Sequence, residues 1–189
     1  LKVSKGLDSR AVLLFDGSLI FRHIETQKVA VKNYFFSSYH RLCKQLHEYS
    51  VLHTAYISLS QSRELVAILA CAHKNNWYFK ELCQFDQAGH KEFNFIHCLD
   101  RDIVGFFLKP GHRTGIFKHR SLSVQGYDDC LRPYFFYLHN GVEIARIEIP
   151  AWIAQSEDQI NYITAVIMDQ CNKGRGYPVC LAEAHEQAV

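Results

Sequence analysis

Asp16 stands where a carboxylate could hold a metal ion. It follows the apolar run at residues 11–15 and precedes Gly17, so its side chain would be fixed at the end of a strand with open space beside it. Such carboxylates bind the divalent cations that activate water and stabilise the charge developing on phosphate during phosphodiester hydrolysis. The same Asp-Gly pair is also typical of a turn in which the aspartate only bonds the backbone. The local pattern alone leaves both interpretations open.

Tyr177 and His185 form a second candidate pair near the C-terminal end. They are eight residues apart, which on a helix corresponds to about 80° of rotation and about 12 Å of rise. Both side chains could therefore border one cleft without touching. There His185 could ligate a metal or position a phosphate, and Tyr177 could donate a hydrogen bond to a phosphate oxygen or to water. In the alternative, Tyr177 only covers a helix start and His185 lies on a partly buried face.

Basic residues that could contact DNA phosphates occur in two stretches of the second half. They are Arg113, Lys118, Arg120, Lys173 and Arg175. Gly174 and Gly176 lie in the second stretch and would let the backbone approach a nucleic acid closely. Such contacts bind DNA without reading its sequence. Scattered cations are also ordinary on a protein surface, so both interpretations stay open.

Two other groups of potential metal ligands are better explained without a metal. His97, Asp100 and Asp102 cluster in the sequence, but we interpret them as a helix start, because acidic side chains in a first turn complement the helix dipole. The seven cysteines include no C-x-x-C pair and no zinc-ligand spacing. We interpret them as reduced thiols.

The composition predicts one domain over residues 1–189, because this length supports a single sizeable core. The hydrophobic fraction of 48% supplies the material for that core. No segment has the length and apolar character of a membrane span or the pattern of a signal peptide. We therefore expect a soluble, cytoplasmic protein. The net charge of +2 is compatible with a nucleic-acid partner and excludes no other.

The local patterns of the first half predict alternating strands and helices. Residues 11–15 and 19–24 are typical of two strands joined by a Gly-Ser turn. Residues 29–49 have helical spacing, with an expected apolar stripe of Val31, Phe35, Leu42, Leu46 and Tyr49. Residues 51–59 resemble a buried strand, and Ser60 or Ser62 can cap a following helix that carries Leu65 on its apolar face.

The second half predicts a hairpin and two helices. Asn140-Gly141 joins the apolar segments 134–139 and 142–149, and this dipeptide is the strongest short hairpin signal. Ser156 with Gln159 forms a capping-box pattern, followed by a stripe of Ile160, Ile163, Ile167 and Cys171 that stops before Gly174. Tyr177-Pro178 opens a short Ala-rich helix. Mixed strands with helices on their faces imply an α/β layered domain.

The second hairpin strand has one face that turns from apolar to polar. Ala145, Ile147 and Ile149 share one side, whereas Arg146 and Glu148 lie on the other. This pattern fits a strand that passes from the core into a cleft. It also fits an Arg-Glu pair on a solvated edge of the sheet, which is the interpretation that we slightly favour from the sequence.

Four motifs, taken in their order along the chain, resemble the NurA nuclease family. They are Phe15-Asp16-Gly17-Ser18-Leu19; Ala55-Tyr56-Ile57-Ser58-Leu59 with Ser62-Arg63-Glu64; Ile144-Ala145-Arg146-Ile147-Glu148-Ile149-Pro150; and Gly176-Tyr177-Pro178 with Glu183-Ala184-His185. The resemblance extends over nearly the whole chain, and the last motif is the most specific.

The resemblance implies a ribonuclease H-like mixed sheet flanked by helices and a manganese-dependent (or magnesium-dependent) DNA nuclease that processes double-strand breaks. It also implies a homodimer that works beside a HerA-type translocase. Asp16 resembles a metal-binding aspartate of the family, and Tyr177 and His185 resemble its C-terminal active-site pair. We accordingly expect Asp16 and His185 to hold the metal, and Arg113, Lys118, Lys173 and Arg175 to contact DNA. A non-catalytic DNA-binding or partner-docking module is the alternative.

The chain departs from the family pattern before Asp16. The family site also uses an earlier aspartate and a glutamate, whereas Asp8 is the sole acid among the fifteen residues that precede Asp16. The only methionine is Met168. We therefore expect a domain that lacks its N-terminal part, with the first two metal ligands encoded upstream of Leu1.

Overall fold

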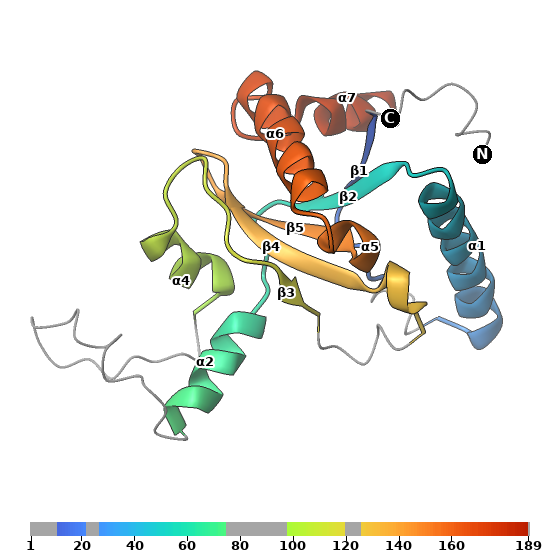
Figure 1. Cartoon of the computed structure of the whole chain (residues 1–189), viewed down its shortest axis with the longest axis horizontal. Helices are drawn as coiled ribbons and strands as arrows, with labels where there is room; N and C mark the ends of the chain where they lie inside the picture. The colour runs from blue at the N-terminus through green and yellow to red at the C-terminus, as the bar shows by residue number, and fades with distance from the viewer. Residues whose placement is uncertain (1–10, 22–26, 75–97, 120–125, 189) are drawn as a thin grey trace, which may run out of the picture.

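A five-stranded mixed sheet forms the centre of the computed structural model, which describes residues 11–21, 27–74, 98–119 and 126–188 (Figure 1). The strands lie in the order β1-β2-β5-β4-β3. β1 and β2 are parallel, and each other neighbouring pair is antiparallel. Their bounds are β1 (Val12–Asp16), β2 (Leu52–Ile57), β3 (Phe117–Lys118), β4 (Pro133–His139) and β5 (Ile144–Pro150).

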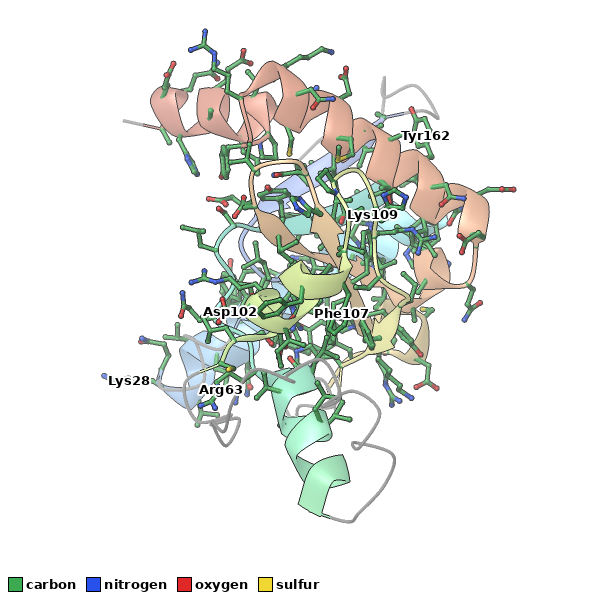
Figure 2. All side chains as sticks on the ribbon, turned by 90° about the vertical axis from the view of Figure 1, so that its left-hand side faces the viewer. Lys28, Arg63, Asp102, Phe107, Lys109 and Tyr162 are labelled. Carbon is green, nitrogen blue, oxygen red and sulfur yellow. The ribbon has the colours of Figure 1, made fainter. Side chains whose placement is uncertain are left out.

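Helices cover both faces of this sheet. Their bounds are α1 (Val29–Glu48), α2 (Glu64–Lys74), α4 (Asp100–Phe107), the 3-10 helix η4 (Asp129–Leu131), α5 (Ala151–Ala154), α6 (Glu157–Lys173) and α7 (Val179–Gln187). α6 and α7 pack with Tyr56 and Ile147 in the main core, whereas α4 and α2 pack with Phe135 and Tyr137, which project from the other face. Figure 2 labels the exposed Phe107 on α4 and the exposed Tyr162 on α6, which lie in these different layers. Within the described ranges, no helix is long and apolar enough to cross a membrane.

The hairpin and the C-terminal helices agree with their local sequence signals. β4 and β5 flank Asn140-Gly141, where the Asn140 side-chain oxygen accepts from the amides of Val142 and Glu143 at 2.9 and 2.8 Å. The Ser156 side chain accepts from the Gln159 amide and caps α6. The predicted stripe is the buried face of that helix: Ile160, Ile163, Ile167 and Cys171. α7 begins after Pro178, as the sequence predicts.

Two local predictions for the first half were wrong in part. The described residues Leu19, Ile20 and Phe21 form no strand. The Leu19 backbone amide donates to the Glu148 carboxylate and the Ile20 backbone amide donates to Ser18 Oγ, so neither amide is available to bond a neighbouring strand. The rest of that predicted strand lies outside the described residues.

The predicted helix at residues 29–49 is present as α1, but its apolar stripe is shifted. It buries Tyr39, Cys43 and Leu46, whereas Val31 and Tyr49 are exposed at 53% and 62%. Aromatic and thiol side chains therefore form the packed face, and they meet Ile20, Tyr127 and Leu131 in a separate cluster.

The polar face of β5 lies in the middle of the protein. β5 is the central strand of the sheet, and Arg146 and Glu148 are only 2% and 1% exposed. The solvated-edge interpretation is therefore wrong. Glu64 at the start of α2 contacts Arg146 Nη2 at 3.1 Å, and the Ser18 hydroxyl donates to Glu148 Oε2 at 2.8 Å.

Candidate functional site

Asp16 is the last residue of β1, the strand at one edge of the sheet. It lies opposite Tyr56 in the parallel ladder, and the Gly17 amide donates to the Tyr56 carbonyl at 3.0 Å. Since side chains alternate along a strand, Asp16 and Tyr56 face the same side of the sheet, the side covered by α6 and α7. Gly17 has a φ of +94°, which glycine adopts without strain, so the chain leaves the strand direction directly after Asp16.

Tyr177 reaches the site through the connection between α6 and α7. Arg175 and Gly176 in this connection have φ values of +57° and +112°. A Cβ added at Gly176 would lie 2.8 Å from a methyl carbon of Val142. Glycine therefore lets the connection pass close against the β4–β5 turn, and it places Tyr177 just before α7, next to the end of β1.

Asp16, Tyr177 and His185 meet in one cluster. Tyr177 Oη donates to Asp16 Oδ1 at 3.1 Å, and His185 Nε2 lies 2.6 Å from Asp16 Oδ2. The rings of Tyr177 and His185 stack, with centroids 6.3 Å apart and an interplanar angle of 28°. The side chains of His185 and Asp16 remain 58% and 45% exposed. The predicted convergence of the three residues is thus confirmed, and the cluster is open to a substrate from solvent.

The ring of Tyr177 packs against the ring of Tyr56. The two rings pack edge to face at 5.7 Å. Burial raises the pKa of Tyr177 to about 12, and its hydrogen bond to the Asp16 carboxylate and the negative charge of that group act in the same direction. Tyr177 is therefore a neutral hydrogen-bond donor at physiological pH, and Asp16 is its acceptor.

Asn140 joins the hairpin turn to the connection that carries Tyr177. Its Nδ2 donates to the Gly176 carbonyl at 2.7 Å and to Tyr56 Oη at 2.9 Å. Tyr56 in turn donates to Glu143 Oε1 at 2.7 Å. Asn140 is 5% exposed, so these bonds are shielded from water. One amide therefore fixes the backbone before Tyr177 and the ring beneath it.

The donor set suits a divalent metal but is incomplete within the described part of the chain. A carboxylate oxygen and an imidazole nitrogen are both ligands for manganese-type ions. Neighbouring ligand atoms of such an ion lie roughly 3 Å apart. Asp16 Oδ2 and His185 Nε2, which are 2.6 Å apart, would therefore need to move apart only slightly to bind the same ion. The described residues contain no group of three or more His, Cys, Asp or Glu side chains placed to hold a metal. Asp16 and His185 would therefore supply part of a site.

The four predicted DNA contacts fall in three places. Lys173, the last residue of α6, and Arg175 lie on either side of Gly174, and Lys173 Nζ pairs with Asp169 Oδ2 at 2.5 Å. Lys118 is on β3, at the edge of the sheet opposite β1. Arg113 binds the side chains of Glu157 and Asn161 on α6, so its guanidinium is already engaged. Only Lys173 and Arg175 accompany the Asp16 cluster, and Arg120 lies outside the described residues.

Asp100 and Asp102 serve the structural role that their sequence context predicts. Asp100 is fully buried, accepts from Ser62 and Tyr137 side chains, and begins α4. The Asp102 carboxylate accepts from the Leu99 amide at the start of the same helix. The interpretation of a helix start is confirmed for both, and His97 lies outside the described residues.

Two residues that support the site escaped the sequence reasoning. Asn140 was interpreted only as a hairpin signal, and Glu148 as a member of an Arg-Glu pair and of the third family motif, without its contact to the turn after Asp16. A signal for Glu148 was present, since two charged residues interrupt an otherwise apolar strand, and buried charges occur where they are paired. No local pattern indicated what Asn140 would bond.

Comparisons with known proteins agree with the motif resemblance. The family model described as NurA domain matches residues 2–189. No curated protein and no solved structure matches the chain.

Proposed function

We propose that this chain, which belongs to the NurA domain family, is the catalytic domain of a metal-dependent DNA nuclease. The observation that carries the proposal is the convergence of Asp16, Tyr177 and His185 at the exposed end of β1. These are the residues that the family resemblance selects, and their chemistry suits phosphodiester hydrolysis.

Asp16 and His185 would hold Mn²⁺ or Mg²⁺ together with further oxygen ligands. When bound, such a cation supplies an activated water molecule and stabilises the charge that develops on phosphate. Asp16 contributes the negative charge that attracts the cation, and neutral imidazole of His185 contributes a nitrogen donor. Both groups already point toward one exposed position, so little conformational entropy is lost on binding.

Tyr177 would act as a hydrogen-bond donor and not as a base. Its pKa of about 12 keeps the hydroxyl protonated at neutral pH. It can therefore orient the Asp16 carboxylate in the free protein. When DNA is bound, the same hydroxyl can donate to a phosphate oxygen or to the attacking water.

Lys173 and Arg175 would contact the DNA backbone on the way into the site. Arg175 belongs to the connection that also carries Tyr177, and Lys173 is the last residue of α6, directly before that connection. Their charges would neutralise phosphates without selecting a base sequence. This agrees with a nuclease that processes DNA ends of any sequence.

Family membership also supports proposals for the surroundings of this domain. We propose a ribonuclease H-like fold, a homodimer, a HerA-type translocase as partner and a role in double-strand break repair. The mixed sheet with helices on both faces supports the proposed fold class.

The test is cleavage of linear DNA in Mn²⁺ by the protein expressed from its complete reading frame. Asp16→Asn keeps the size of the side chain but removes the charge that holds the cation, so we expect the rate to fall at least about a hundredfold. Asp158→Asn changes an exposed acid in the first turn of α6 and serves as the matched control. Circular dichroism would establish that both variants are folded.

The outcomes separate the enzyme from its alternative. An undiminished rate for Asp16→Asn would assign Asp16 to a purely structural turn. DNA binding by the wild-type protein without cleavage in Mn²⁺ or Mg²⁺ would instead indicate a DNA-binding module that keeps the fold without the chemistry.

A further inference from the structure

We propose that Glu148 is a positioning residue that holds the turn after Asp16, and thereby keeps the Asp16 carboxylate within hydrogen-bond reach of Tyr177 and His185. The positional claim stands on the contacts of Glu148 alone. Its consequence for DNA cleavage rests on the proposed nuclease function.

Glu148 binds the turn directly. Its Oε2 accepts from Ser18 Oγ at 2.8 Å and from the Leu19 amide at 2.9 Å. Ser18 Oγ also accepts from the Ile20 amide at 2.9 Å. Glu148 is 1% exposed, so no water competes for these bonds. The turn is therefore tied to the central strand across 130 residues of sequence.

The Glu148 anchor lies on the face of the sheet opposite to the Asp16 side chain. Glu148 is in register with Ala55, whereas Asp16 is in register with Tyr56, and neighbouring residues of a strand face opposite sides. Both Glu148 oxygens are engaged there, so the residue is no ligand for a cation at Asp16. It acts on Asp16 through the chain that joins them.

The turn needs such an anchor because of where Asp16 stands. β1 is an edge strand with one ladder neighbour, and the last backbone bond to that neighbour is from Gly17 to Tyr56. Gly17, with a φ of +94°, is the sole residue between Asp16 and the anchored Ser18. Glycine restrains the backbone least of all residues. Tyr127 Oη also donates to the Leu19 carbonyl at 2.8 Å, so loss of the two Glu148 bonds would loosen Ser18 and the end of β1 without releasing the whole segment.

A carboxylate is required at position 148 because every partner is a donor. Arg146 Nε donates to Oε1 at 3.0 Å, while the turn occupies Oε2. Arg146 is itself held by Ser62 Oγ at 2.9 Å and lies 3.7 Å over the Phe135 ring. A glutamine side chain has only one acceptor oxygen. It could accept from Arg146 or from the turn, and the donors of the other partner would then face its NH₂ group.

The charge at position 146 is maintained in this buried place. Burial lowers the pKa of Arg146, but Glu148, Tyr137 and Glu64 outweigh that effect and its net pKa is raised. Arg146 therefore keeps its positive charge beside Glu148. A buried ion pair often adds little net stability compared with well-packed apolar residues, so its presence here fits a role in placing the turn.

The experiment reads the position of Asp16 without using cleavage. 3-Fluorotyrosine at position 177 of the 189-residue chain gives one ¹⁹F resonance, whose chemical shift at neutral pH reports the hydrogen bond from Tyr177 to Asp16. Asp16→Asn defines the shift for a lost carboxylate. We expect Glu148→Gln to change the chemical shift by at least half as much as Asp16→Asn does.

Glu64→Gln is the matched control. It also removes a carboxylate from Arg146 but does not touch the turn, so the resonance should stay at the wild-type position. If Glu148→Gln fails to fold, Ser18→Ala decides, because it removes one bond to the turn and leaves the Arg146–Glu148 pair intact. A wild-type shift in Glu148→Gln, or in Ser18→Ala where that variant decides, would overturn the proposal. So would an equal shift in Glu64→Gln.

Cleavage assays then distinguish this proposal from the proposed function. If the resonance moves as expected and the wild-type protein cleaves no DNA, Glu148 positions Asp16 in a protein that is not a nuclease. If it cleaves DNA, Glu148→Gln should lower kcat about 10- to 100-fold with a smaller change in KM, and Glu64→Gln should leave both near wild type.

Discussion

Asp16 and His185 are 169 residues apart in the chain, yet His185 Nε2 lies 2.6 Å from Asp16 Oδ2. The contact joins the end of the edge strand β1 to the last helix, α7. It places a carboxylate and an imidazole at one exposed position, and Tyr177 occupies the second carboxylate oxygen at 3.1 Å. Asp16 therefore meets both of its partners at a position that is open to solvent.

Tyr177→Phe should lower DNA cleavage about 10- to 100-fold and leave the fold intact. The substitution keeps the packing of the ring against Tyr56 and its stacking on His185, but removes the donor to Asp16. Rates in Mn²⁺ and thermal unfolding would be measured side by side. Tyr34→Phe, at a tyrosine 78% exposed on α1, is the control. Equal rates for the two variants would reduce Tyr177 to a packing role.

Lys173→Ala and Arg175→Ala should weaken DNA binding more than Lys118→Ala. The first two residues flank the connection beside Tyr177, and Lys118 lies on β3 at the opposite edge of the sheet. In a plot of log affinity against log salt concentration, each lost phosphate contact should make the slope shallower by about one unit. Fluorescence anisotropy over a salt series measures this slope. Equal slopes for all three variants would show that DNA does not enter along the α6–α7 connection.

Asn140→Ala should destabilise the protein by about 1–3 kcal/mol, because it removes several hydrogen bonds made by a buried side chain. The lost bonds are the one to the buried Tyr56 Oη and those to the part-buried Gly176 carbonyl and backbone amides of Val142 and Glu143. Urea denaturation measures the free energy of unfolding. Asn172→Ala, at an exposed position of α6, should change it by less than about 0.5 kcal/mol. A similar small change at Asn140 would contradict the role assigned to its amide.

His53 should make the protein sensitive to acid. The pKa of His53 is lowered from 6.5 to about 4, mainly by burial and to a smaller extent by His47, against an opposing hydrogen bond to the Val51 carbonyl. Between these two pH values the unfolded chain binds a proton that the folded protein does not. The stability contributed by neutral His53 is thus complete above pH 6.5 and is lost as pH falls toward 4, by about 3 kcal/mol.

The measurement is the free energy of unfolding at pH 7 and at pH 4 in wild type and His53→Asn. We expect the loss between these pH values to be about 3 kcal/mol smaller in the variant. His112→Gln, at an exposed histidine before Arg113, is the control and should lose as much as wild type. An unchanged loss in His53→Asn would place the acid sensitivity elsewhere.

Elements with local signals were predictable from the sequence. Asn140-Gly141 indicated the β4–β5 hairpin, and Ser156 with Gln159 indicated the start of α6, because a turn or a helix cap is satisfied by residues within four positions. The buried stripe of α6 followed from helical spacing for the same reason. The buried face of α1 was not predictable from its own residues. Tyr39 and Cys43 are buried because they pack against Ile20, Tyr127 and Leu131, which lie outside that helix.

The candidate site was predictable only through its motifs. A spacing of eight residues allowed Tyr177 and His185 to border one cleft, but nothing local connects either residue to Asp16. The resemblance to NurA proteins supplied that connection, and the register of β1 with β2 and the loop at Gly176 explain it physically.

By itself, then, the sequence determined the β4–β5 hairpin, the start and buried face of α6, the family, and the identity of Asp16, Tyr177 and His185 as candidate residues. The tertiary structure alone decided that β5 is the central strand, that Arg146 and Glu148 are buried, and that Glu148 holds the turn after Asp16. The physical reason is that the environment of a charged side chain depends on strand order and on contacts between residues distant in sequence. Local spacing specifies the face on which a side chain lies, but not what will cover that face.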